Sequence, residues 1–126
     1  AKPWFETPWR GLVAVGLNER FRFYRYEPGE YFAPHSDGPF QRENGECSHF
    51  TFLMYLNDDF AGGHTIFHFS EPLDVAPKAG SVLVFHHPLV HEGATVESGV
   101  KYVLRSDVMY SNPNTVCTEE GSPKTL

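Results

Sequence analysis

The sequence lacks a long apolar run, an excess of basic residues and a framework of cysteines. No apolar stretch in its 126 residues approaches the roughly 20 residues that a membrane-spanning helix needs. Lys and Arg number 10 against 16 Asp and Glu, for a net charge of -6, which disfavours a nucleic-acid partner because such proteins need a basic face to meet phosphates. The two cysteines, Cys47 and Cys117, have no metal or redox spacing, so we expect a reduced pair. Without a signal peptide or membrane segment, we expect a cytoplasmic protein with no membrane partner.

What the sequence does have is enough apolar and aromatic side chains for a folded core. Hydrophobic residues make up 40% and aromatic residues 15% of the chain, a composition typical of a globular protein rather than a disordered one. At this length we expect one domain over residues 1–126, with its core at about residues 20–110 and a mobile tail over residues 111–126.

Short alternating runs separated by Gly and Pro turns predict an all-β chain. We expect strands over residues 20–26, 31–37, 49–57, 65–69, 73–75, 81–86, 89–92 and 100–110. Residues 4–18 could form either one short strand or one short helix. Closely spaced short strands with such turns predict a jelly roll, also called a double-stranded β-helix, with little or no helical support.

One set of polar residues has the composition of a metal site, and we call it the ligand trio: His35, Asp37 and His91. Two imidazoles and one carboxylate form the facial set that binds non-heme Fe(II) and leaves positions open for other ligands. Residues two apart on a strand point to the same side, which explains the spacing of His35 and Asp37. We expect the two strands that carry the trio to be brought together at one mouth of the barrel by the long connections between the sheets.

The other histidines have competing interpretations. His64 and His68 are four residues apart and would share a strand face, so they could form a metal pair of their own. His86 and His87 are adjacent and would face opposite ways, with one of them buried and hydrogen-bonded. We expect His49 to lie at the surface or at the end of the barrel.

Lys101 gives a second signal. It lies in an alternating strand and shares a face with Arg105. Lysine is rarely buried without a partner, so an inward lysine near a metal would indicate an anionic ligand bound beside the metal. The alternative is an exposed lysine on an edge strand.

Three blocks of the sequence, in order, resemble the Fe(II)/2-oxoglutarate dioxygenases in their prolyl 4-hydroxylase-like branch. The first block is RFYRYEPGEYFAPHSDG at residues 22–38, and the second joins FTFLMYLN at 50–57 to GGHT at 62–65. The third runs from PKAG at 77–80 through HEG at 91–93 to KYVLRSDVMY at 101–110. The resemblance covers about residues 20–110.

The resemblance implies a role for individual residues. The ligand trio would bind Fe(II), and Lys101 would pair with the far carboxylate of 2-oxoglutarate. Tyr55 would donate its hydroxyl to the same carboxylate, and Tyr26 would line the cosubstrate pocket. Arg105 could hold 2-oxoglutarate, contact the substrate or pair with Asp107. O2 would be the second cosubstrate, and ascorbate would stimulate the reaction.

The activity implied is hydroxylation of an unactivated C–H bond, with release of succinate and CO2. By family analogy the substrate would be a prolyl residue in a protein or peptide. Three alternatives stay open: a hydroxylase of a free amino acid or small metabolite, a catalytically idle 2-oxoglutarate sensor, and a jelly-roll metalloprotein without oxygenase activity. A nucleic-acid demethylase is disfavoured by the net acidity. The loop at residues 41–48 would be a substrate lid, in which Arg42, Glu43 and Glu46 could read a charged substrate.

Overall fold

The computed structural model describes residues 3–111, 115–116 and 124–125, and within these ranges the chain forms strands and no α-helix. A short 3-10 helix spans Trp4–Glu6. The strands are β1 (Val13–Leu17), β2 (Arg22–Tyr26), β3 (Phe32–His35), β4 (Cys47–Tyr55), β5 (Ala61–Gly62), β6 (Thr65–Phe67), β7 (Leu73–Val75), β8 (Val82–His86), β9 (His91–Gly93), β10 (Val96–Ser98), β11 (Lys101–Ser111), β12 (Thr115–Val116) and β13 (Lys124–Thr125).

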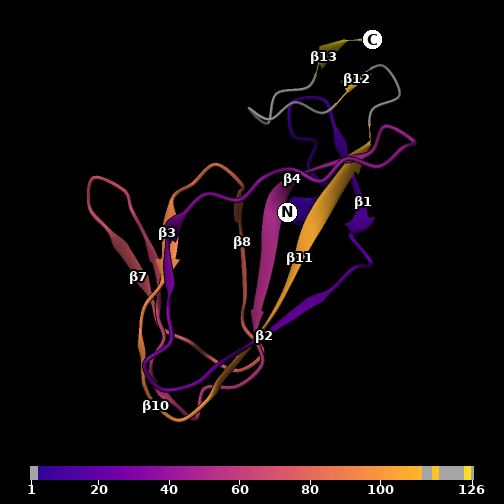
Figure 1. Cartoon of the computed structure of the whole chain (residues 1–126). Coiled ribbons are helices and arrows are strands. Elements are labelled where there is room, and N and C mark those ends of the chain that lie inside the picture. The colour runs from indigo at the N-terminus through magenta and orange to yellow at the C-terminus, as the bar shows by residue number, and fades with distance from the viewer. Residues whose placement is uncertain (1–2, 112–114, 117–123, 126) are drawn as a thin grey trace.

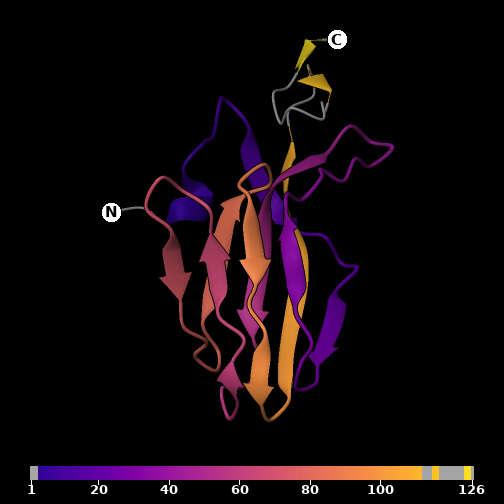
Figure 2. The same cartoon turned by 60° about the vertical axis from the view of Figure 1, so that its left-hand side comes forward.

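Two antiparallel sheets face each other. The major sheet has five strands in the order β1-β11-β4-β8, with β2 also paired to β11, and the minor sheet has the order β3-β9-β6-β7. In Figure 1, β3 and β7 of the minor sheet lie on the left, and β4 and β11 of the major sheet lie to their right. Figure 2 brings the minor sheet forward, with its four strands side by side. The predicted all-β jelly roll is confirmed.

The long strands lie where their alternation predicts, and the short ones differ. β1 falls in the segment that the sequence leaves open, and it pairs with β11 through a register shift at Ala14 and Gly16. Residues 58–64 lie outside the expected strands, but Ala61–Gly62 among them forms β5 and pairs with β10. Strands this short are set by their pairing partners rather than by local propensity. β3 ends at His35, so the predicted extension of this strand to Asp37 is wrong.

The two faces of β4 differ in burial. Thr51 and Tyr55 are buried on the side that faces the minor sheet, whereas Phe52 on the other side is only half-buried. His49 is 2% exposed and packs its ring against Trp9, with ring centroids 4.8 Å apart. The surface position considered for His49 is therefore wrong.

The structure describes only one of the two cysteines and little of the tail. Cys47 is disulfide-bonded, which corrects the expectation of a reduced thiol there, whereas Cys117 lies outside the described residues. The predicted mobile tail also falls largely outside them. Within the described ranges, no helix is long and apolar enough to span a membrane.

Candidate metal and anion site

Direct strand pairing brings the ligand trio together. β3 and β9 are neighbours in the minor sheet, and their register places His35 opposite His91, with ring centroids 4.3 Å apart. The expectation that long connections join these strands is therefore wrong, because they are hydrogen-bonded to each other. Asp37 lies just past the end of β3, where its backbone N–H donates to the carbonyl of His87 at 2.9 Å.

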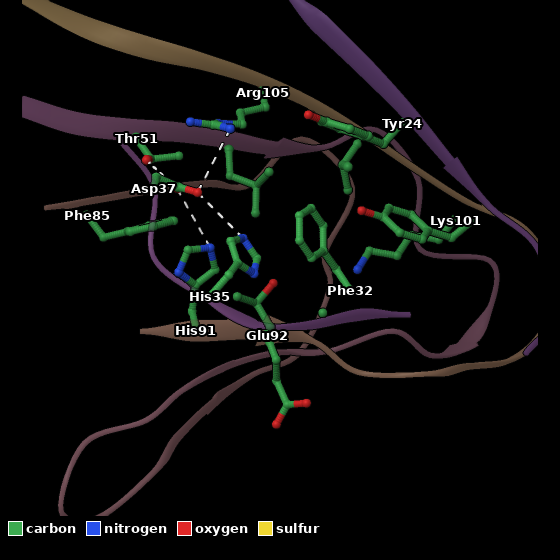
Figure 3. A pocket seen from close by; sticks show the side chains of 15 residues that line it. Tyr24, Phe32, His35, Asp37, Thr51, Phe85, His91, Glu92, Lys101 and Arg105 are labelled. Atoms are coloured by element: carbon green, nitrogen blue, oxygen red, sulfur yellow. Dashed lines mark hydrogen bonds and ion pairs between the residues drawn. The ribbon is translucent and has the colours of Figure 1, made fainter. Parts of the chain in front are cut away.

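The trio converges on one point (Figure 3). Nε2 of His35 is 3.5 Å from Oδ1 of Asp37, and Nε2 of His91 is 3.7 Å from Oδ2. One ligand atom from each of the three residues lies within 4.8 Å of the others. Among the described residues, no other three His, Cys, Asp or Glu side chains come together in this way.

The backbone fixes the tautomer of both histidines. Nδ1 of His35 lies 2.7 Å from the carbonyl of Ala33, and Nδ1 of His91 lies 3.0 Å from that of Leu89. A carbonyl can only accept a hydrogen bond, so both Nδ1 atoms carry a proton, and the Nε2 atoms, which face Asp37, are the ones left to bind a metal. Burial lowers the pKa of His91, which favours this neutral form. Two neutral imidazoles and one carboxylate fit a divalent iron ion.

Arg105 lies on the major-sheet side of the trio. Its guanidinium is 3.5 Å from Asp107 and 3.9 Å from Oδ1 of Asp37. Of the three roles that the sequence left open for this arginine, pairing with Asp107 is the one observed.

A pocket extends from the trio between the two sheets. It holds about 500 Å³ of empty space, part of it open to solvent. The trio and Arg105 line it together with Lys101, and the aromatic side chains of Tyr24 and Phe32 lie between them in Figure 3. Phe32 stacks on the ring of His35 with a centroid distance of 3.8 Å. The pocket therefore combines a metal-ligand set and a buried cation along one mostly apolar wall.

Lys101 is a buried cation without a counter-charge. It is 4% exposed, its Nζ donates to the carbonyl of Gly63 at 2.7 Å, and it lies 5.1 Å from the ring centroid of Tyr26. No carboxylate of the described residues forms an ion pair with it. Burial lowers its pKa to about 8. Of the two positions considered for Lys101, the inward one is observed. A charge there is costly unless an anion binds beside it, and the bound anion stays a prediction.

The two predicted tyrosines differ in their position. Tyr26 lines the pocket, and burial raises its pKa to about 12. Tyr55 is fully buried behind the wall, and its hydroxyl bonds that of Thr65, which lines the pocket. Thr65 was missed by sequence reasoning, as were Thr51 and Phe32. For Thr51 the sequence contained a signal, because Thr51 lies on the same alternating face of β4 as Tyr55.

The remaining histidines are not metal partners of each other. His64 pairs with Asp74 at 2.6 Å, and His68 pairs with Glu92 at 3.1 Å. The carboxylate of Glu92 points away from the trio in Figure 3, consistent with a structural role. His87 is buried and bonded to two hydroxyls, so the prediction of one buried, hydrogen-bonded member in the adjacent pair is confirmed.

In the loop at residues 41–48, Arg42 pairs with one glutamate of the loop and with one outside it. The guanidinium of Arg42 lies 2.6 Å from Glu46 and 2.5 Å from Glu19. No residue of this loop lines the pocket. Arg42 and Glu46 therefore hold the loop in place, and the lid function stays a prediction.

Comparison with known proteins gives a consistent family. A model of the 2OG-Fe(II) oxygenase superfamily matches residues 21–106. The chain is 33% identical over 122 residues to a mimivirus protein (Acanthamoeba polyphaga mimivirus) named "Putative prolyl 4-hydroxylase", an alignment that covers 81% of this chain and 50% of that protein. It is 36% identical over 97 residues to an uncharacterised fowlpox virus protein, covering 76% of this chain and 22% of that one. The chain thus spans half or less of these curated relatives.

Solved structures share the fold. A 2OG-Fe(II) oxygenase family oxidoreductase from Burkholderia pseudomallei has a TM-score of 0.59 at 23% identity, covering 72% of this chain and 41% of its own. The viral collagen prolyl hydroxylase of Paramecium bursaria Chlorella virus-1 has a TM-score of 0.56 at 24% identity, covering 75% and 63%. A prolyl-4-hydroxylase from Pseudomonas putida has a TM-score of 0.56 at 23% identity, covering 70% and 50%.

Proposed function

We propose, from the premise that this chain belongs to the 2OG-Fe(II) oxygenase superfamily, that it hydroxylates prolyl residues of a protein or peptide using Fe(II), 2-oxoglutarate and O2. The observation that carries the proposal is the single pocket in which the ligand trio and the uncompensated Lys101 occur together. A set of metal ligands without an anion site would fit many metalloproteins. A dicarboxylate that binds the metal at one end needs in addition a cation for its other end, and Lys101 provides it.

The residues have separate tasks in this proposal. The trio holds Fe(II) through its two Nε2 atoms and the carboxylate of Asp37. Lys101 neutralises the far carboxylate of 2-oxoglutarate, and the hydroxyls of Tyr26 and Thr65 line the space around it. Fe(II) bound there, with 2-oxoglutarate and O2, supplies the oxidising chemistry that yields succinate, CO2 and a hydroxylated substrate. The apolar wall keeps water from the reacting groups.

The prolyl substrate is supported by the names of the relatives rather than by a contact in the pocket. Peptides with several prolines and matched peptides with alanine in their place, together with free amino acids, form the test set. We expect a mass gain of one oxygen on proline peptides only, dependent on both Fe(II) and 2-oxoglutarate. A mass gain on the alanine peptides or on free amino acids alone would overturn the prolyl assignment while leaving the oxygenase class intact.

Binding of 2-oxoglutarate should depend on pH through Lys101. Burial lowers the pKa of this ammonium group from about 10.5 to about 8 in the free protein, and the dianion binds the charged form. Affinity should therefore be level below pH 8 and fall by up to about tenfold per pH unit above it. In the free protein the free energy of unfolding should rise across the same interval, because the unfolded chain binds the proton that the folded chain has lost.

Calorimetric titration of the Mn(II)-loaded protein with 2-oxoglutarate, from about pH 6.5 to about pH 9.5, measures how the affinity changes with pH. The matched control is Lys101→Arg, which stays charged throughout this range and should bind with an affinity that does not change with pH. An equal decline in both proteins would assign the pH dependence to another group.

A further inference from the structure

Behind the carboxylate of Asp37 lies a row of buried polar side chains. Ser48, Thr51 and His87 are 0%, 1% and 2% exposed. Oγ1 of Thr51 is 2.6 Å from Oδ2 of Asp37 and 2.8 Å from Nδ1 of His87, and Oγ of Ser48 is 2.8 Å from Nε2 of His87. These contacts connect the metal ligand to a histidine outside the ligand trio.

The chemistry of the groups fixes the direction of each hydrogen bond. The ionised carboxylate of Asp37 only accepts, so Thr51 donates its proton to Oδ2 and must accept from Nδ1 of His87. Nε2 of His87 is the only acceptor that the Ser48 hydroxyl has among the described residues, so Nε2 accepts from Ser48. Oγ of Ser48 in turn accepts from the backbone N–H of Phe40 at 2.8 Å. Each hydroxyl and each ring nitrogen of the row thus has a partner, and the hydrogen bonds all run in one direction.

A β-bulge makes this arrangement possible. Ser48 and Thr51 are three residues apart on β4, so in a regular strand their side chains would point to opposite faces. The register with β11 shifts between Met109, opposite Ser48, and Val108, opposite Phe50. His49 is the extra residue, and the insertion turns Ser48 to the same side as Thr51.

The row begins and ends on the same short segment of chain. Phe40 starts it and Asp37 ends it, while the N–H of Asp37 also donates to the carbonyl of His87. The hydroxyl of Ser36 adds a bond of 3.0 Å to the carbonyl of Pro88. Asp37 lies beyond the end of β3 and has no strand pairing of its own, so these bonds hold it in place.

We infer that Thr51, His87 and Ser48 are positioning residues. They orient the carboxylate of Asp37 so that one particular oxygen faces the metal. The hydroxyl of Thr51 donates to Oδ2, whereas Oδ1 receives no hydrogen bond from any described residue and lies 3.5 Å from Nε2 of His35 and 3.9 Å from the guanidinium of Arg105. Oδ1 is therefore the oxygen that the row leaves available to a metal. The inference rests on the proposed function, because it needs the trio to be a metal site.

Co(II) titration, followed by absorption spectroscopy, tests the inference without turnover. Thr51→Val removes the hydroxyl and keeps the shape of the side chain, and we expect Co(II) affinity to fall about 10- to 100-fold, as for other residues that orient metal ligands. Thr51→Ser keeps the hydroxyl and should bind nearly as the wild type does. His87→Asn keeps a donor at the Nδ1 position and should retain affinity, whereas His87→Leu should lose it.

A second measurement uses the unaltered, metal-free protein. Nitrogen-15 NMR of the imidazole should show the His87 proton on Nδ1 and none on Nε2. A proton on Nε2, or Thr51→Val binding Co(II) with wild-type affinity and spectrum, would overturn the inference while the proposed function stands. If the wild type itself bound no Co(II), the proposed function would fail, and the inference with it.

Discussion

Replacing Asp37 by alanine is expected to abolish hydroxylation. The substitution removes the one anionic member of the ligand trio and leaves two imidazoles, which hold Fe(II) with lower affinity and without a fixed third corner. It also leaves the hydroxyl of Thr51 without its acceptor, so a buried donor of the row behind Asp37 is left without a hydrogen bond. Product formation by mass spectrometry and Fe(II) binding by titration should decline together.

The matched control for this variant is Asp74→Asn. Asp74 is an exposed carboxylate on β7 that pairs with His64, so its neutralisation should leave both metal binding and turnover unchanged. Hydroxylation retained in Asp37→Ala would mean that a different carboxylate completes the metal site, and the trio would have to be reassigned.

The second large effect is expected at Lys101, where binding and stability should change in opposite directions. Lys101→Met keeps the length of the side chain and removes the charge. Affinity for 2-oxoglutarate should fall by about 2–4 kcal/mol, or roughly 30- to 1,000-fold, because the buried carboxylate of the ligand loses its partner. The free protein should keep or raise its melting temperature, since the uncompensated buried ammonium group is gone.

Calorimetric titration and thermal unfolding of the same samples measure the two effects. Lys78, an exposed lysine, gives the control variant Lys78→Met, which should change neither quantity. A marked loss of stability in Lys101→Met with unchanged affinity would show that the lysine serves the fold, through its bond to Gly63. Reduced affinity in Arg105→Met but not in Lys101→Met would move the anion site to Arg105.

The two sheets contribute different parts of the site. The minor sheet supplies the paired histidines on β3 and β9, and the major sheet supplies Lys101 and Arg105 on β11 and Thr51 on β4. The pocket therefore exists only when the sheets face each other. This explains why residues so far apart in the sequence form one site.

What the sequence predicted follows from local rules. Alternation placed Lys101 and Arg105 on one face of β11 and left open whether that face points inward. The structure shows that it does, because Lys101 is buried. The spacing of His35 and Asp37, together with the resemblance to a family, identified the trio.

The features that the sequence did not predict depend on contacts between distant segments of the chain. The direct pairing of β3 with β9, the bulge at His49 and the bonds of His87 to two hydroxyls all arise from register. Register depends on how the hydrophobic patterns of two paired strands match and on the turns between them, so it does not follow from one strand considered alone.

The most direct test of the account is succinate formation by the purified protein with Fe(II), 2-oxoglutarate and ascorbate under air. We expect succinate to appear only when iron is present, to increase when a hydroxylatable proline peptide is added, and to be lost in Asp37→Ala. A folded, iron-loaded wild-type protein that formed no succinate, with or without peptide, would contradict the assignment of this site to 2-oxoglutarate-dependent oxidation.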